Sequence, residues 1–142
     1  MPPDKRSDAL LHVTDMGAHH FRVSRAPRTP NPRNEKKVRA PQGKSMLTCW
    51  KGDETSTRSD TDPLAGELLG RKAARLGDRK ATWLPPPPFG RSEWQLFNLE
   101  SDPGEVMDPS SETPDMARKL IQIYDDYAKR CGVVESSRDI DL

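Results

Sequence analysis

The feature that most constrains the fold lies near the C-terminus, where apolar residues recur at helical spacing. Thr113 and Pro114 suit the cap and first turn of a helix, and Gly132 suits its C-terminal stop. The apolar residues between them form one stripe: Met116, Ala117, Leu120, Ile121, Tyr124, Tyr127, Ala128 and Cys131. An isolated helix of this length is marginal in water. The pattern therefore predicts a helix over 114–131 that covers another surface.

The segment before this helix has the pattern of a small antiparallel sheet. Two strand-like runs, 71–76 and 79–84, are separated by Gly77-Asp78, a glycine-first pair that suits a two-residue hairpin loop. A third run, 93–99, alternates with apolar groups on both faces, and an Asp-Pro-Gly turn follows it. We therefore predict an α+β fold, in which a small antiparallel sheet of three to four strands is packed by one C-terminal helix.

Four consecutive prolines, Pro85 to Pro88, stand between the last two of these runs. A connection between strands tolerates proline because it need not donate ladder hydrogen bonds. The alternative is a polyproline peptide captured by a partner. Trp83 and Trp94 flank the prolines, and two tryptophans favour a packed environment. We interpret the run as a stiff link inside the sheet and predict that both tryptophans are at least partly buried.

The N-terminal part of the chain is basic and polar. The chain has 142 residues, of which 32% are hydrophobic and 32% are charged, and it contains 14 prolines. Such a composition lies near the boundary between folded and disordered chains. Residues 1–51 hold 11 Lys/Arg and 4 Asp/Glu, scattered without a helical stripe or interleaved aromatics. We therefore expect a solvated arm rather than a nucleic-acid interface. We divide the chain into a basic, partly disordered segment at 1–62, the α+β subdomain at 63–135 and a flexible tail at 136–142.

Neither a membrane span nor a secretion signal is visible in the sequence. No run approaches the ~20 apolar residues of a spanning helix, and the first residues lack a continuous apolar core. The two cysteines, Cys49 and Cys131, are far apart and define no disulfide framework. We expect a cytoplasmic protein that binds neither membrane nor nucleic acid.

Several short motifs suggest binding sites, and each lacks a required part. The Gly-Lys-Ser of residues 43–45 is similar to a phosphate loop, but Val38 stands where its first glycine is needed. The adjacent aspartates 125 and 126 lie mid-helix and point about 100° apart, so they cannot share one ion. Three histidines lack cysteine or carboxylate partners at ligand spacing: His12, His19 and His20. We therefore predict no catalytic, cofactor-binding or metal-binding residue.

The run from Gly66 to Val134 resembles the C-terminal subdomain of the type I sulfatases, the arylsulfatases. That subdomain has a Glu-Leu-Phe-Gly strand, an Arg-Ala-Arg-x-Gly-Asp-x-Lys hairpin, a proline-bearing link, Trp-x-Leu-Tyr-Asp-Leu, Asp-Pro-Gly-Glu and a helix ending in Gly-Val-Val. The corresponding stretches here are GELLG at 66–70, RKAARLGDRK at 71–80, WQLFNL at 94–99, DPGE at 102–105 and GVV at 132–134.

Two weaker pieces precede this run, and parts of the chain depart from the family. LLHVTDM at 10–16 looks like the end of the large sulfatase domain, and KVRAPQGKSML at 37–47 looks like the Gly-Lys/Arg-Ser-Leu segment that joins the two parts. Family members have an amphipathic helix where this chain has residues 17–33. No helical period survives there, so we expect no helix. The family also has aromatics where this chain has Gly66, Leu69 and Arg79.

The resemblance implies sulfate-ester hydrolysis by a formylglycine nucleophile made within Cys/Ser-x-Pro/Ala-x-Arg, with a divalent cation, usually calcium, held by Asp-Asp and Asp-Asn pairs. Neither cysteine stands in that motif, and Ser24 to Arg28 matches its letters without the Thr-Gly that follows in the family. We therefore expect a truncated sulfatase fragment that lacks the catalytic domain and is inactive alone. The alternatives are one piece of a split sulfatase, which needs a separate catalytic chain as its partner, and a proline-mediated interaction module.

Overall fold

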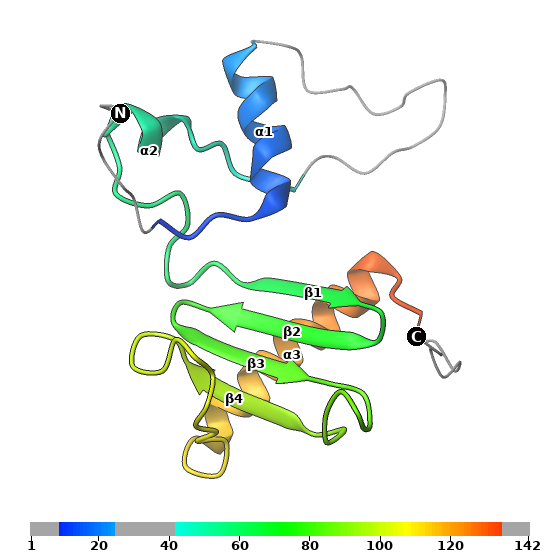
Figure 1. Cartoon of the computed structure of the whole chain (residues 1–142). Helices are drawn as coiled ribbons and strands as arrows, with labels where there is room; N and C mark the ends of the chain where they lie inside the picture. Colours follow the sequence, from blue (N-terminus) through cyan, green and yellow to red (C-terminus); the bar gives the residue numbers. More distant parts are fainter. Residues whose placement is uncertain (1–8, 25–41, 135–142) are drawn as a thin grey trace. The chain divides into compact units, whose positions relative to one another are not determined.

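The structure is a computed structural model that describes residues 9–24 and 42–134. The chain divides into two compact units, 1–59 and 60–142, which are treated separately (Figure 1). The predicted tail at 136–142 lies outside the described residues, as do residues 1–8 and 25–41 of the basic segment. The elements, in chain order, are α1 (Val13–Val23), α2 (Leu47–Lys51), β1 (Leu64–Leu68), β2 (Arg71–Leu76), β3 (Arg79–Trp83), β4 (Trp94–Asn98) and α3 (Pro114–Cys131).

The second unit contains the predicted antiparallel sheet, with four strands in the order β1-β2-β3-β4. Leu76 pairs with Arg79, so Gly77 and Asp78 form the two-residue hairpin loop that the sequence indicated. Gly77 has a φ of +57°, which suits a glycine at the first loop position. The strand that precedes this hairpin, β1, supplies the fourth strand of the predicted range. The α+β prediction is confirmed.

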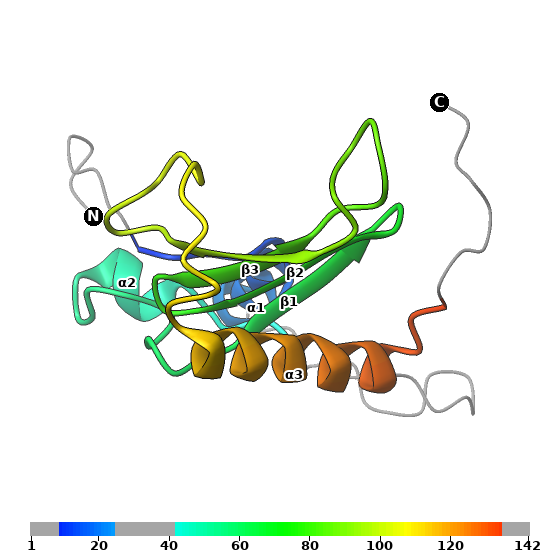
Figure 2. The ribbon, with the colours of Figure 1, turned by 90° about the horizontal axis from the view of Figure 1, so that it is seen from below.

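Helix α3 runs along one face of this sheet (Figure 2). Ala74 and Ala81 are directly paired at the centre of the sheet and are each 1% exposed. Two such small side chains let the helix come close, and Leu120 (0% exposed) and Tyr124 pack there with Leu96 of β4. The core of the unit is therefore one apolar layer between sheet and helix.

The predicted helix boundaries are confirmed, but two members of the stripe, Ile121 and Cys131, are not among the residues packed on the core cluster. The helix begins at Pro114 after the N-cap Thr113 and ends at Gly132 in the left-handed conformation. Ile123 packs against the core cluster, whereas Ile121, which we had placed in the stripe, is not among the residues packed on it. Helical spacing alone does not separate these two positions, because each lies about 80° from the midpoint between Leu120 and Tyr124.

The proline run is a folded connection, as predicted. β3 ends at Trp83, β4 begins at Trp94, and these two residues face each other in the antiparallel register. Between them the Phe89 N–H donates to the Pro86 carbonyl at 3.3 Å, which closes a turn. An extended polyproline helix has no such internal hydrogen bond. Both tryptophans are half-buried, and Trp94 packs edge-on against Tyr124 with ring centroids 5.5 Å apart.

The first unit contains a helix where we expected none. α1 spans Val13–Val23, so the expectation that 17–33 holds no helix is wrong for residues 17–23. Among the α1 side chains that the structure describes, the buried ones are Ala18 and Asp15. The buried Asp15 is held by polar contacts, which a search for an apolar stripe does not detect.

Trp94→Ala should destabilise the second unit, because it removes a half-buried ring from the layer between sheet and helix. We expect a loss of about 2–4 kcal/mol in the free energy of unfolding, followed by urea denaturation with circular dichroism. Pro86→Ala is the matched control in the adjoining link. It keeps the carbonyl that Phe89 uses and should cost less than about 1 kcal/mol. A larger loss from Pro86→Ala than from Trp94→Ala would contradict this description of the core.

Candidate functional site

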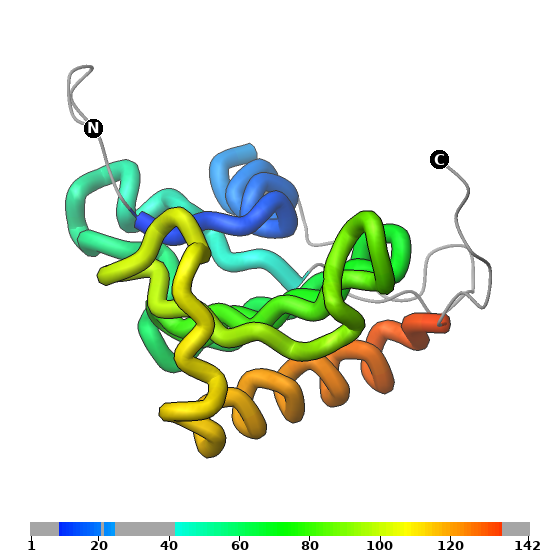
Figure 3. The backbone as a smooth tube through the Cα atoms, turned by 60° about the horizontal axis from the view of Figure 1, so that its bottom comes forward, coloured from blue at the N-terminus to red at the C-terminus, as the bar shows by residue number. Residues whose placement is uncertain are grey.

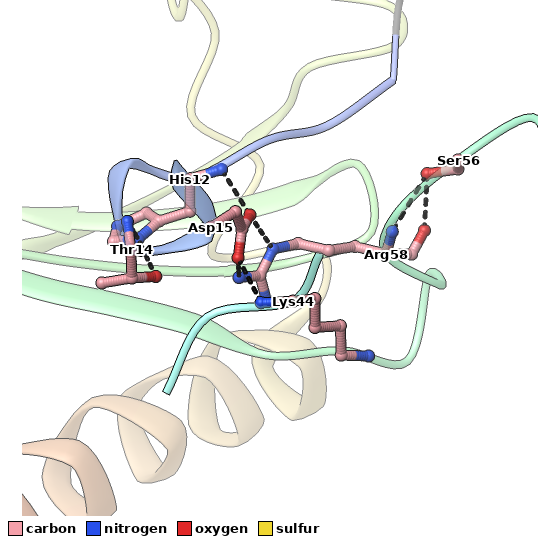
Figure 4. Close-up of polar contacts among 6 residues, drawn as sticks. All are labelled: His12, Thr14, Asp15, Lys44, Ser56 and Arg58. Atoms are coloured by element: carbon pink, nitrogen blue, oxygen red, sulfur yellow. Dashed lines mark hydrogen bonds and ion pairs between the residues drawn. The ribbon is translucent and has the colours of Figure 1, made fainter. Parts of the chain in front are cut away.

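Asp15 is the buried charged residue among those that the structure describes, with 0% exposure. Four N–H groups donate to its two carboxylate oxygens. Oδ2 accepts from the His12 N–H at 2.8 Å and from Arg58 Nε at 3.0 Å. Oδ1 accepts from the Lys44 N–H at 2.7 Å and from Arg58 Nη2. Figure 4 shows these donors converging on the carboxylate from three separate stretches of chain. We call this group the Asp15 cluster.

The start of α1 places Asp15 at the centre of this cluster. His12 is the N-cap, and its ring Nδ1 accepts from the Thr14 N–H at 3.4 Å. Asp15, at the third helical position, accepts in return from the His12 N–H. This reciprocal arrangement is a capping box, and it satisfies N–H groups that the helix itself leaves unpaired. His12 therefore belongs to a helix cap.

Gly43 brings a second stretch of chain against α1. A Cβ at Gly43 would lie 1.9 Å from the Thr14 carbonyl oxygen, so only glycine fits. Figure 3 traces the segment from 42 to 46 beside the start of α1. This close approach lets the Lys44 N–H reach Asp15, while the Lys44 side chain is exposed. The Gly43-Lys44-Ser45 stretch therefore places a backbone N–H, that of Lys44, against the carboxylate of Asp15.

Arg58 supplies the only side-chain donors of the cluster. Its guanidinium presents Nε and Nη2 to the two oxygens of Asp15 in a fork, and its side chain is 7% exposed. A bidentate pair of this kind combines strength with a fixed geometry. Ser56 orders the backbone there, because its hydroxyl donates to the Arg58 carbonyl at 2.7 Å.

The pKa of Asp15 follows from these contacts. Burial acts to raise it, but the hydrogen bonds from Arg58, Lys44 and His12 and the charge of Arg58 outweigh burial and hold the pKa below its ordinary value. Asp15 is therefore ionised at neutral pH. With two N–H donors on each oxygen, the carboxylate has no acceptor direction left for a substrate proton or a metal ion. The cluster holds structure together rather than performing chemistry.

A second carboxylate anchors the loop after β4. Asp108 Oδ1 accepts from the Leu96 N–H at 2.9 Å and from the Ser110 N–H at 3.0 Å. Burial would raise the pKa of Asp108, but these bonds, a side-chain bond from Ser110 and the charge of Arg91 lower it. Because β4 is an edge strand, Asp108 satisfies an N–H that would otherwise be open to another strand. Lys80 of β3 contacts Glu105 of the same loop at 2.6 Å.

In the described part of the chain, the histidines and cysteines considered above as ligands do not come together in one metal site. His19 packs edge-on against Trp50, with ring centroids 4.2 Å apart, and His20 is exposed. Within residues 9–24 and 42–134, no group of three or more His, Cys, Asp or Glu is placed to hold a metal ion. Cys49 and Cys131 are free thiols. Ser24 ends α1 as its C-cap, and the rest of its motif, 25–28, lies outside the described residues.

Sequence reasoning missed both members of the central pair, Asp15 and Arg58. One signal was present, since His12 and Asp15 have the spacing of a capping box just before a helix. Nothing local indicates Arg58, which lies 43 residues further along the chain.

The comparisons with known proteins come from sequence and from structure. No family model matches the chain. An uncharacterized sulfatase of Schizosaccharomyces pombe is 28% identical over 137 residues, which cover 96% of this chain and 24% of that protein. A Bacteroides thetaiotaomicron protein of glycosaminoglycan metabolism matches 81% of this chain with a TM-score of 0.62 at 17% identity. A protein solved with its substrate D-glucosamine-2-N,6-O-disulfate matches 74% with a TM-score of 0.50 at 16% identity.

The four-stranded sheet with one covering helix thus recurs as a small part of larger proteins. This chain covers about a quarter of the length of each of these three proteins, at 24%, 24% and 23%. The chain is thus similar in sequence to a sulfatase over part of that protein, and residues 66–134 carry the stretches that resemble the C-terminal subdomain of the family. No helix among the described residues is long and apolar enough to cross a membrane.

Gly43→Ala should destabilise the first unit, because the added methyl group would overlap the Thr14 carbonyl and displace the Lys44 N–H from Asp15. We expect amide hydrogens of α1 to exchange faster, by a local opening free energy at least about 2 kcal/mol lower. Gly17→Ala is the matched control. A Cβ there meets nothing within 4 Å, so alanine should slow exchange by up to about 1 kcal/mol through helix propensity. Equal protection in both variants would contradict the Asp15 cluster.

Proposed function

We propose that this chain is the C-terminal part of an arylsulfatase, a hydrolase of sulfuric esters. In this proposal the second unit packs on the catalytic domain and borders the substrate cleft. The supporting observation is that the sulfatase-like motifs occupy successive elements of one continuous fold. The hairpin of β2 and β3, the proline link, β4 and α3 follow each other in the family's order, with Asp102 and Glu105 in the loop before α3.

In this proposal, the catalytic chemistry that the family implies lies outside this chain. The formylglycine motif surrounds neither Cys49 nor Cys131. Calcium does not fit the buried carboxylate of Asp15, whose oxygens already accept four N–H groups. We therefore assign both the nucleophile and the cation to a catalytic domain. The contribution of this chain is a rigid scaffold, in which β4 and its following loop are fixed by Asp108 and Lys80.

Two alternative functions are compatible with the same fold. A split sulfatase would bring the catalytic domain on a separate chain, and it requires the same packing surfaces. An interaction module would offer the prolines to a partner. The internal turn from Pro86 to Phe89 disfavours that use, as does the contact of the Arg71 guanidinium with the Phe89 ring, whose centroid lies 5.0 Å from Arg71 Cζ.

A chimera tests the proposal. This chain replaces the matching quarter of the Schizosaccharomyces pombe sulfatase, and sulfate release from an aryl sulfate is measured with calcium present. We expect kcat/KM within about tenfold of the parent protein, since the replaced part carries no catalytic group. The isolated chain and the parent lacking its matching quarter should both show no turnover. A folded but inactive chimera would contradict the proposal, as would turnover by the isolated chain.

A further inference from the structure

Strand β1 lies at one edge of the sheet (Figure 1), and no other strand among the described residues pairs with its outer side. An edge strand presents unpaired N–H and C=O groups to any further strand, and proteins commonly block it with lysine, proline or a bulge. β1 itself contains none of these, and its register with β2 is unbroken from Leu64 to Leu68. At the opposite edge, Asp108 takes up the Leu96 N–H of β4. β1 is therefore the open edge of the sheet.

The hairpin of β1 and β2 decides which backbone groups of β1 point outward. Leu68 pairs with Arg71, and the two loop residues between them have φ values of +52° and +76°, as in a two-residue hairpin turn. The pair that closes such a turn exchanges hydrogen bonds across the hairpin, and every second pair along an antiparallel ladder does the same. The residues between these pairs are Ala65 and Glu67. Their N–H and C=O groups therefore point away from the sheet.

A second copy of β1 fits these outward groups. In an antiparallel pair with Gly66 facing Gly66 of the second copy, Ala65 exchanges both hydrogen bonds with Glu67 of that copy. The twofold symmetry repeats the exchange, so all four outward N–H and C=O pairs are used. Leu68, which is 68% exposed, then lies opposite Leu64 of the second copy, on the sheet face away from α3. The edge is therefore complementary to itself in both hydrogen bonding and apolar contact.

Neighbouring registers lose part of this fit. A pair centred on Glu67 would place two carboxylates opposite each other, which is destabilising. A pair centred on Ala65 would place Glu67 opposite Pro63, which has no N–H to donate. In the register centred on Gly66, each Glu67 lies opposite an alanine, and its carboxylate accepts from the Gly70 N–H of its own chain at 2.7 Å.

Gly66 suits the centre of such a pair. A glycine inside a strand commonly marks a place where another backbone approaches closely. A Cβ at Gly66 would meet nothing within 4 Å, so no contact with the described residues accounts for the glycine. The family that this chain resembles has an aromatic at this position, so the open centre of β1 is a feature of this chain.

We propose that this chain forms a symmetric dimer through β1, which joins the two four-stranded sheets edge to edge. The proposal uses only the edge of the second unit and is independent of the sulfatase function. Four hydrogen bonds and two leucine contacts make a small interface, so we expect a dissociation constant on the order of 10–100 μM.

Sedimentation equilibrium of the full chain tests for the dimer. The apparent mass should rise from that of one chain toward that of two between about 5 and about 500 μM. Leu68→Lys should weaken association at least about tenfold, because it places a charge on the edge and removes the contact with Leu64. Val106→Lys is the matched control. Its side chain is 83% exposed in the loop after β4, so the dissociation constant should change by less than about twofold.

Disulfide formation tests the register. Cys49 and Cys131 are changed to serine, and Gly66→Cys and Leu68→Cys are compared under mild oxidation. In the proposed pair the two Cα atoms at position 66 are about 4.5 Å apart, within the range of a disulfide. Those at position 68 are separated by four residues along the strand, about 13 Å, and cannot be bridged. We expect Gly66→Cys to form the covalent dimer at least about tenfold faster than Leu68→Cys.

Each contrary result would overturn the proposal. A chain that remains monomeric over this concentration range has no such interface. A dimer that Leu68→Lys and Val106→Lys weaken equally uses another surface, and equal crosslinking at positions 66 and 68 excludes the register centred on Gly66. These measurements do not involve sulfate hydrolysis, so their failure leaves the proposed function intact.

Discussion

The carboxylate of Asp15 is the interaction on which the first unit depends. A buried charge is costly unless it is paired and hydrogen-bonded, and removing one partner of such a pair typically costs about 3–5 kcal/mol. Here every oxygen is satisfied, by the helix cap at His12, by the backbone at Lys44 and by the fork of Arg58. The cluster therefore ties together three stretches of chain that are far apart in the sequence.

The two units are stabilised by different physical means. In the second unit, paired alanines at 74 and 81 let α3 approach the sheet, and the buried apolar layer supplies the stability. In the first unit, a glycine at 43 lets backbone approach backbone, and a charged pair supplies the specificity. A chain with only 32% hydrophobic residues can form both because the apolar residues are concentrated where the sheet and helix meet.

The sequence predicted the second unit well because its signals are local. Gly77-Asp78 defines a hairpin loop, and Pro114 and Gly132 bracket a helix, each through the dihedral preferences of one or two residues. The first unit could not be predicted in the same way. Its helix has an inner face built on Asp15, whose partner Arg58 is 43 residues distant. The Gly43-Lys44-Ser45 letters suggested a phosphate loop, whereas the glycine serves a close approach that only the folded chain shows.

The most direct test of this account is an NMR titration of the Asp15 carboxyl carbon together with amide exchange of α1. The pKa of Asp15 in the folded chain is lowered, so the carboxylate contributes stability above the unfolded value of about 3.9 and loses it as pH falls through the folded value. The account predicts a titration midpoint below about 3.9, with the protection of α1 lost over the same pH range. A midpoint at or above the ordinary value, with α1 protected on both sides of it, would contradict the structural role of Asp15.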